Sequence, residues 1–513
     1  MISKVLAITL QGFDALPVEV EAGVYRGLPD LTVVGLPDAV LRESRERVRS
    51  AVVNAGYQWP SRRMLVNLAP AHIRKEGSGL DLAVGVSLLK ASGQLPELDT
   101  DELVFVGELS LDGTVRATRG VLAAALTMSL WPRKILVVPS DNLREAVRGT
   151  AKVMTVESLA QLRDPRLMGR KTADAYAGKA ELIADCPDTK PERKGVFDRT
   201  AHIDLSMVRG QYRAKRALEI AAAGKHHLLL IGPPGSGKSL LARCLHGIMP
   251  PMETREALEV NRVYSVAGLL DADEPWVEAR PFRSPHVGVT KAGLIGGGQP
   301  FRPGEVSLAH NGVLFIDELP EMNRGVLESL RQPLEEGYVT ISRAWGSVTI
   351  PARIQLVASA NPCPCGYYGE YPPKCKCLDY EIRRYQSRFS GPLLDRVDLV
   401  VKVPRLGIDD LTETAASGED SAAVAQRVSR VWKRRLEEGR DRVWDPDDPG
   451  NKLSRKCAAW AAEAYEKYRL TARGYFRMLL LARTIADLSG EEAISVTSLA
   501  EALEYRLGFE ELK

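Results

Sequence analysis

The sequence lacks any apolar run approaching eighteen residues, so it contains no candidate membrane-spanning helix. The segment Met1–Ile8 has a short apolar piece but no credible signal-peptide cleavage site after it. Cysteine is scarce, at 7 of 513 residues, which excludes a disulfide-rich secreted scaffold. We therefore expect a cytoplasmic protein without a membrane partner.

A large excess of either charge is also absent. The chain has 69 Lys and Arg residues against 66 Asp and Glu residues, a net charge of +3. Any contact with nucleic acid must therefore come from local loops and not from a basic field over the whole surface. Length predicts roughly three domains, and 45% hydrophobic residues suffice for each to bury a core.

The most informative segment is a complete phosphate-binding loop. Its glycines let successive backbone N–H groups turn towards phosphate, Lys238 can reach the β and γ oxygens, and the Ser239 hydroxyl can hold Mg²⁺. A short apolar strand, 227–231, precedes the loop, and a helix, 240–246, follows it. The predicted ATP-binding residues are Gly232, Pro233, Pro234, Gly235, Ser236, Gly237, Lys238 and Ser239.

A second segment supplies the carboxylates that such a loop needs. Four apolar residues, Val313–Ile316, predict a buried parallel strand that ends at Asp317 and Glu318. Asp317 suits the Mg²⁺ shell, and Glu318 suits the residue that polarises the attacking water. Together the two segments predict an ATPase that uses ATP and Mg²⁺.

Four of the cysteines lie in two closely spaced pairs, Cys363 with Cys365 and Cys375 with Cys377. In a reducing compartment this crowding favours a metal site over disulfides, and four thiolates match the tetrahedral geometry of structural zinc. The alternative is free surface thiols, because a CxC spacing is less diagnostic than CxxC and no histidine accompanies it.

The hydrophobic pattern divides the chain into four parts. Strands and helices alternate over 1–168, which predicts an α/β domain, and the polar stretch 169–199 reads as a linker. Residues 200–405 form the nucleotide domain. Apolar stripes over 422–438, 455–468 and 473–488 predict an all-helical lid within 406–513.

These features resemble the AAA+ ATPases, and in particular the magnesium-chelatase-like YifB/ComM family, over nearly the whole chain. The resemblance implies an AAA+ P-loop αβα core with a helical lid. Besides the two nucleotide motifs, the residues that carry it are Gly210-Gln211, 214–221, 283–286, 302–310, 361–366, 390–396 and 472–474.

The resemblance also assigns catalytic roles. Asn361 matches the sensor-1 residue that orients the lytic water, Arg396 the arginine finger that a neighbouring subunit inserts against the γ-phosphate, and Arg473 sensor 2. Arg388 is a rival for the finger, and both Arg396 and Arg473 could instead pair with nearby carboxylates or helix ends. A finger that acts in trans requires a homo-oligomer, by family resemblance a hexameric ring.

The N-terminal domain resembles the Lon protease domain through 75–81 and 107–116. The family's serine nucleophile falls at Gly79 and its lysine at Leu122, while Ser78 is one place away without a suitable lysine. The resemblance therefore implies a Lon-like domain without proteolytic activity.

Two segments of the nucleotide domain are candidates for DNA contact. The segment 287–303, with Lys291, resembles the helix-2 insert of this AAA+ clade. Alternating apolar residues over 338–351 predict a β-hairpin before sensor 1, with Arg343 and Trp345 at its tip. An arginine beside an aromatic plane suits phosphate and base contact, although Trp345 could equally pack on a neighbouring subunit.

Two functions are consistent with these residues. One is a DNA motor, such as a branch-migration helicase in recombination and natural transformation, as the YifB/ComM resemblance implies. The other is a chelatase-like or protein-remodelling ATPase that acts on a partner protein. The core fold is shared by both and does not separate them.

Overall fold

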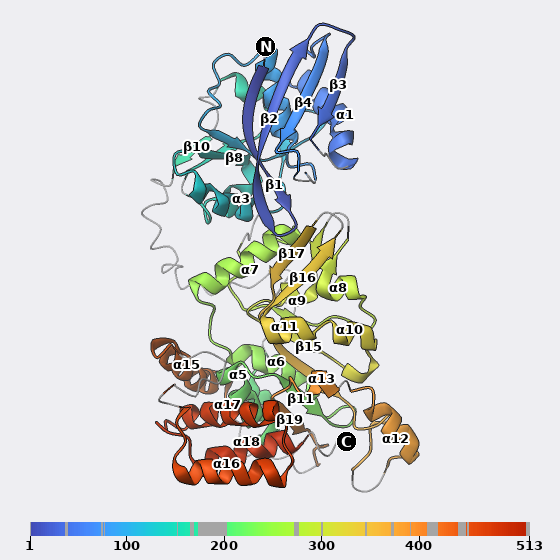
Figure 1. The fold of residues 1–513 in the computed structure, drawn as a ribbon, viewed down its shortest axis with the longest axis vertical. Helices are drawn as coiled ribbons and strands as arrows, with labels where there is room; N and C mark the ends of the chain where they lie inside the picture. The colour runs from blue at the N-terminus through green and yellow to red at the C-terminus, as the bar shows by residue number, and fades with distance from the viewer. Residues whose placement is uncertain are drawn as a thin grey trace.

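The computed structural model describes most of the chain (Figure 1). The described residues are 2–35, 39–72, 75, 77–150, 152–164, 169–172, 203–270, 276–298, 301–343, 346–370, 374–389, 391–407, 419–439, 448 and 451–508. Most of the predicted linker 169–199 therefore lies outside them, as does Trp345. In this part of the chain no helix is long and apolar enough to cross a membrane.

The N-terminal region is an eight-stranded mixed sheet in the order β10-β9-β8-β5-β1-β2-β4-β3. Parallel pairs join β1, β5, β8 and β9, whereas β1, β2 and β4 pair antiparallel. The strands are β1 (Ile2–Gln11), β2 (Asp14–Tyr25), β3 (Asp30–Val34), β4 (Arg63–Ala69), β5 (Leu103–Phe105), β8 (Ile135–Pro139), β9 (Lys152–Val156) and β10 (Gly169–Thr172). The short β6 (Glu108–Leu109) and β7 (Val115–Arg116) form a separate pair.

Four helices pack with this sheet: α1 (Ala39–Asn54), α2 (Asp81–Ala91), α3 (Val121–Thr127) and α4 (Leu143–Ala146). Almost every residue of α2 is buried, in agreement with the buried helix that its apolar sequence predicts. β10 differs from the sequence expectation, because it pairs with β9 at the start of the segment predicted to be linker. β1 lies in the middle of the sheet, between β5 and β2.

The middle of the chain is a five-stranded sheet, all parallel, in the order β12-β15-β18-β11-β19. Its strands are β12 (Phe282–Arg283), β15 (Val313–Ile316), β18 (Gln355–Ala360), β11 (Leu228–Ile231) and β19 (Leu399–Lys402). Every residue of β11, β15 and β18 is buried, because both faces of the sheet are covered. The helices of this region are α5 (Tyr212–Gly224), α6 (Lys238–Ile248), α7 (Thr254–Ala267), α9 (Glu305–Leu308), α10 (Arg324–Glu328), α11 (Arg331–Glu336), α12 (Asp379–Gln386) and α13 (Gly391–Leu394).

The predicted hairpin is present as β16 (Tyr338–Arg343) and β17 (Gly346–Pro351), and the pair Arg343 and Gly346 closes its register. The insert forms α8 (Lys291–Ile295) and the short pair β13 (Gly296–Gly297) and β14 (Arg302–Pro303). The two elements touch, because Arg343 Nη2 lies 2.7 Å from the position that a Cβ atom on Gly297 would occupy.

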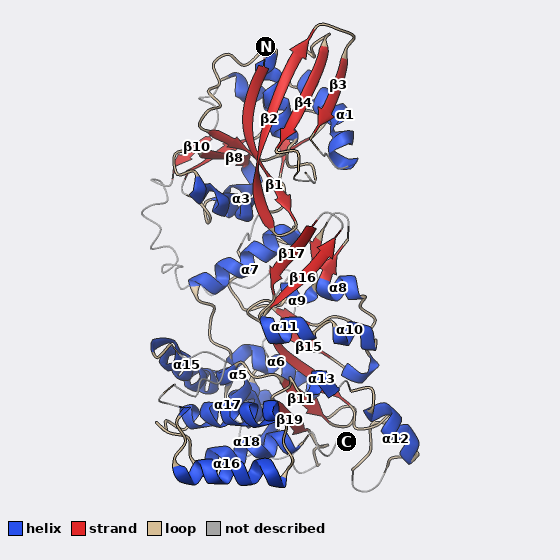
Figure 2. Cartoon of the chain, in the orientation of Figure 1, coloured by secondary structure: helices blue, strands red, loops and turns tan. Residues whose placement is uncertain are grey.

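The lid consists of α15 (Ser421–Glu437), α16 (Arg455–Lys467), α17 (Ala472–Leu488) and α18 (Val496–Leu507) (Figure 2). Each begins at a side-chain cap, from Asp420, Ser454, Thr471 and Ser495 respectively. Its apolar faces share one hydrophobic cluster with α5, α6 and the sheet. Sequence patterns predict the first three of these helices but not α18.

The N-terminal region joins the core through α7 and β17. Arg262 of α7 donates to Asp14 at 2.9 Å and its guanidinium lies over the Phe13 ring, while Ser265 donates to Glu145 at 2.5 Å. A Cβ atom on Gly12, whose φ is +65°, would overlap Val348 of β17. The two regions thus share a packed interface.

Candidate nucleotide site and neighbouring arginines

The phosphate-binding loop follows the carboxyl end of β11 and runs into α6. Gly235 and Gly237 have φ of +75° and +91°, a left-handed conformation that glycine adopts without strain. Lys238 is buried and donates to the Gly232 and Pro233 carbonyls at 2.7 and 2.8 Å. Burial lowers the pKa of Lys238, while Asp317 and Glu318 oppose that shift.

Two neighbouring strands, β18 and β15, bring the other predicted groups to this loop. Asn361, after β18, accepts a hydrogen bond from Lys238 Nζ at 3.2 Å, and Ser239 Oγ lies 3.2 Å from Asp317, which follows β15. Glu318 is exposed and has a left-handed φ of +53°, uncommon for a residue other than glycine. The Ser236 hydroxyl is buried and has no hydrogen-bond partner among the described residues. These donors and carboxylates fit a bound triphosphate with Mg²⁺.

Ser359 is a part of this site that the sequence motifs did not indicate. Its hydroxyl donates to the Asp317 carboxylate and accepts the Glu318 backbone N–H at 3.0 Å. Ser359 lies on β18, which pairs directly with β15, so it holds the two acidic residues in place. Knowledge of the strand order would have been needed to find it.

Arg396 lies near the amino-terminal ends of the parallel strands, whereas the phosphate-binding loop lies at their carboxyl ends. Arg396 precedes β19, whose first residue Leu399 pairs with Leu228 at the start of β11, whereas the phosphate-binding loop follows the end of β11. Arg396 is only 7% exposed and forms an ion pair with Glu335 of α11 at 2.5 Å.

Arg473 shares that carboxylate, at 2.6 Å from Glu335 Oε1. The two arginines, which sequence motifs place in separate roles, therefore meet at one residue. The hydrogen bond from Arg396 is the main cause of the lowered pKa of Glu335. Its effect is larger than that of partial burial, which raises the pKa. Nothing in the sequence pattern marked Glu335. The rival finger, Arg388, instead contacts Glu321 at 3.1 Å.

Lid arginines hold the backbone next to Arg396. Arg477 of α17 donates to the Arg396 carbonyl at 2.7 Å and pairs with the buried Asp398, and Arg506 of α18 donates to the Val397 carbonyl at 2.6 Å. Burial lowers the pKa of Arg506 to about 10, although Asp398 opposes that shift. The lid thus fixes the segment that carries Arg396.

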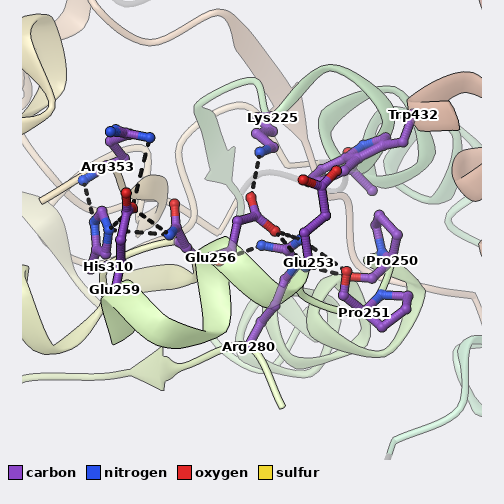
Figure 3. Close-up of polar contacts among 12 residues, drawn as sticks. Lys225, Pro250, Pro251, Glu253, Glu256, Glu259, Arg280, His310, Arg353 and Trp432 are labelled. Carbon is purple, nitrogen blue, oxygen red and sulfur yellow. Dashed lines mark hydrogen bonds and ion pairs between the residues drawn. The ribbon is translucent and has the colours of Figure 1, made fainter. Parts of the chain in front are cut away.

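A second contact between lid and core surrounds Trp432 of α15 (Figure 3). The Lys225 ammonium lies 4.0 Å and the Arg280 guanidinium carbon 4.7 Å from the ring centroid. Both cations also contact Glu256 of α7, at 3.1 and 2.5 Å. Further along α7, Glu259 accepts from the buried His310 at 3.0 Å. The helix that meets the N-terminal region therefore also meets the lid network.

The four clustered cysteines come together after β18. Their Sγ atoms lie within 4.8 Å of one another, with Cys363 at 3.4 Å from Cys365 and 3.7 Å from Cys375. Four thiolates on a tetrahedral zinc at about 2.3 Å stand about 3.8 Å apart, so this arrangement fits such an ion. Partial burial raises the pKa of Cys365, but the Tyr367 and Lys376 backbone N–H groups outweigh it and bring the pKa to about 6.

The positions that would hold a Lon-like dyad carry no such chemistry. Leu122 is fully buried, and its backbone N–H donates to Glu145 and Ser265 at the interface with α7. Ser78 donates to Glu108, and the buried Lys75 donates to the Gly35 and Pro70 carbonyls. In these residues no hydroxyl is paired with a lysine amine.

Comparisons with known proteins agree with this site. Family models described as magnesium chelatase subunit ChlI match residues 204–411, with the related models for subunit ChlI and its C-terminal part at 20–142 and 418–506. The chain is 40% identical to the competence protein ComM of Haemophilus influenzae over 504 residues, 96% of this chain and 95% of that protein. It is 39% identical to the uncharacterized protein YifB of Escherichia coli, with the same coverage of both chains. A magnesium-chelatase 38 kDa subunit of Cereibacter sphaeroides is 27% identical over 180 residues, 31% of this chain and 52% of that protein.

Proposed function

Because the chain belongs to the magnesium-chelatase-like AAA+ ATPases of the YifB/ComM type, we propose that it is a ring-forming motor that acts on DNA. Its task would be branch migration or unwinding when foreign strands are recombined into the chromosome. The relative named a competence protein supports a link to DNA uptake. The proposal rests on full-length similarity to that protein together with one structural observation, the exposed cations of the hairpin and insert.

Those cations are Arg343 of β16 and Lys291 of α8, on two elements that touch at Gly297. Both side chains are exposed, and among the described residues neither has a carboxylate within ion-pair distance. An exposed cation at the end of a hairpin strand suits a backbone phosphate, and this contact needs no particular base sequence. Trp345, the adjoining tip residue, lies outside the described residues and stays a predicted base contact.

ATP and Mg²⁺ would occupy the loop and its carboxylates. Lys238 would exchange its carbonyl partners for phosphate oxygens, and Ser239 with Asp317 would hold Mg²⁺. Glu318, oriented by its strained backbone and by Ser359, would polarise the attacking water next to Asn361.

Arg396 would serve the nucleotide of a neighbouring subunit. Leu399 pairs with Leu228, the first residue of β11. The four residues of β11 rise about 3.3 Å each, so the phosphate-binding loop begins about 13 Å further along the strand direction than Leu399. This distance is greater than the length of an arginine side chain, so Arg396 does not reach the loop of its own subunit. Its partner Glu335 also holds Arg473, so both arginines would reach the same subunit boundary. A finger that acts across such a boundary requires a closed homo-oligomer, and the family resemblance makes it a hexameric ring.

The cysteine cluster would hold one structural zinc ion. Cys363, Cys365, Cys375 and Cys377 supply a complete tetrahedral set, which leaves no position for a catalytic water. The ion would fix the chain that follows Asn361. Gly366 of this segment lies against Pro234, since a Cβ atom there would be 2.5 Å from Pro234 Cδ.

ATP hydrolysis measured with single-stranded, duplex and branched DNA tests the proposal. We expect stimulation by DNA that Glu318→Gln abolishes and that Arg343→Ala with Trp345→Ala reduces. Lys467→Ala, an exposed lid cation, is the matched control and should keep full stimulation. Hydrolysis that no form of DNA stimulates would contradict the proposal and favour a chelatase-like ATPase that acts on a partner protein.

A further inference from the structure

The loop that carries the four cysteines, described at 362–370 and 374–378, leads to α12, which projects from the core well away from the hairpin (Figure 1). The described parts of the loop and the helix carry exposed cations and aromatic rings. We call this set the knuckle surface: Tyr368, Lys374, Lys376, Tyr380, Arg383 and Arg384, all exposed.

The geometry of α12 explains why part of this surface faces outwards. Ile382 and Tyr385 are buried on one side of the helix, and Tyr385 packs in a hydrophobic cluster of the core. Tyr380 precedes Arg383 by three residues and Arg384 by four, so these three side chains share the opposite face. Tyr380 is 63% exposed and Tyr368 is 50% exposed, so both rings are accessible to a partner.

The cations of the knuckle surface are available to a partner. Lys374, Lys376, Arg383 and Arg384 form no ion pair among the described residues, whereas the nearby Arg388 pairs with Glu321. Three carboxylates lie on the same stretch, and one of them, Glu381, is engaged, because it accepts the Leu378 backbone N–H at 2.9 Å. Glu370 is half-buried in the loop, and Asp379 is exposed at the start of the helix. Four cations against three carboxylates leave the set with a small positive balance.

From this arrangement we propose that the knuckle surface is a second nucleic-acid contact, which binds single-stranded DNA. The four cations supply phosphate contacts, and the two tyrosine rings supply planes on which bases stack without sequence preference. The inference rests on the proposed DNA function and deepens it, because a branched substrate offers strands at more than one place on the motor.

The knuckle surface is also connected to the ATP site. Cys363 is buried two residues after Asn361, and Gly366 lies against Pro234 of the phosphate-binding loop. Asn361 in turn contacts Lys238. A DNA strand bound to Lys374 and Lys376 would therefore contact the loop that follows Asn361, the predicted water-orienting residue. Bound DNA would in this way be connected to ATP hydrolysis.

The test is fluorescence anisotropy with a labelled single-stranded oligonucleotide over a range of salt concentrations. The variant replaces Lys374, Lys376, Arg383 and Arg384 with Gln. We expect its affinity to fall by about tenfold or more, and the slope of log affinity against log salt to shrink by about 0.7 for each lost phosphate contact. The matched control replaces Lys452, Arg455, Lys456 and Arg469, four exposed lid cations, with Gln and should stay within twofold of the wild type.

A second variant, Tyr368→Leu with Tyr380→Leu, tests the rings separately. We expect at least about a fivefold loss of affinity for each stacking contact, with the salt slope unchanged. Zinc content and hydrolysis without DNA, measured for each variant, show that the loop is intact; if the fourfold variant loses them, Arg383→Gln with Arg384→Gln on the exposed face of α12 replaces it.

The outcomes separate the two proposals. Wild-type protein that binds no DNA would overturn the DNA function and this inference together. Wild-type binding that the fourfold variant and the lid control share equally would overturn the inference alone. A change in oligomeric state without a change in DNA affinity would show that the knuckle surface meets a neighbouring subunit instead, and would overturn it as well.

Discussion

Replacement of Arg396 by alanine should nearly abolish ATP hydrolysis while the protein stays folded. An arginine finger contributes about 1,000- to 100,000-fold to turnover. This range corresponds to about 4–7 kcal/mol of transition-state stabilisation, at about 1.36 kcal/mol per decade. Folding should survive because Glu335, the ion-pair partner of Arg396, is 37% exposed and keeps Arg473 at 2.6 Å.

Mixing two inactive variants shows whether Arg396 acts in trans. The Arg396→Ala subunit keeps Glu318, and the Glu318→Gln subunit keeps Arg396. A boundary at which the first subunit binds ATP and the second supplies the arginine therefore has both groups. In an equal mixture about one quarter of the boundaries are complete, so hydrolysis should recover to about a quarter of the wild-type rate. The assay is phosphate release from the mixture and from each variant alone, with subunit exchange followed by energy transfer between labels.

Arg388→Ala is the control, because that arginine pairs with Glu321 and lies outside the Glu335 contact. It should change turnover far less than Arg396→Ala does. The reasoning would be refuted if labelled subunits exchange and yet the mixture hydrolyses no more ATP than the two variants do separately, or if Arg388→Ala causes the larger loss.

Three further predictions concern stability and the metal. Trp432→Ala removes the ring between Lys225 and Arg280, and should lower the free energy of unfolding by about 2–4 kcal/mol in denaturant titrations; a change under 1 kcal/mol would contradict the lid contact. Burial lowers the pKa of His310 in the folded protein, so below about pH 6.5 the unfolded chain binds more protons and stability falls as pH falls. His310→Gln should reduce the dependence of stability on pH, measured by thermal unfolding between about pH 7 and 5.5. An unchanged pH dependence would contradict a contribution from His310. Cys375→Ser should lower both the bound zinc and the rate of ATP hydrolysis. Full hydrolysis by zinc-free protein would show that the cysteine cluster does not support the ATP site.

Sequence patterns were sufficient where neighbouring residues define the structure. The phosphate-binding loop, the strand before Asp317 and the hairpin over 338–351 all appear with the expected elements. Their backbone conformation follows from local glycine placement, short apolar runs and alternation. Three of the lid helices, α15, α16 and α17, were predictable for the same reason, since they carry their own caps and apolar stripes, whereas α18 was not.

Contacts between distant segments were not predictable. Glu335 joins Arg396 and Arg473 only because α11, the approach to β19 and the lid meet in space. Ser359 became visible as a partner of Asp317 once β18 was paired with β15. β1 carries an ordinary apolar sequence, and its place in the sheet depends on pairing with β2 and β5 rather than on its own residues.

ATP-driven movement on DNA is tested most directly by the displacement of a labelled strand from a branched DNA substrate, with ATP, by the wild-type protein and by Glu318→Gln. We predict displacement by the wild type that requires ATP and is lost in the variant. Active ATP hydrolysis with DNA bound but no strand displaced from any branched or forked substrate would contradict the account.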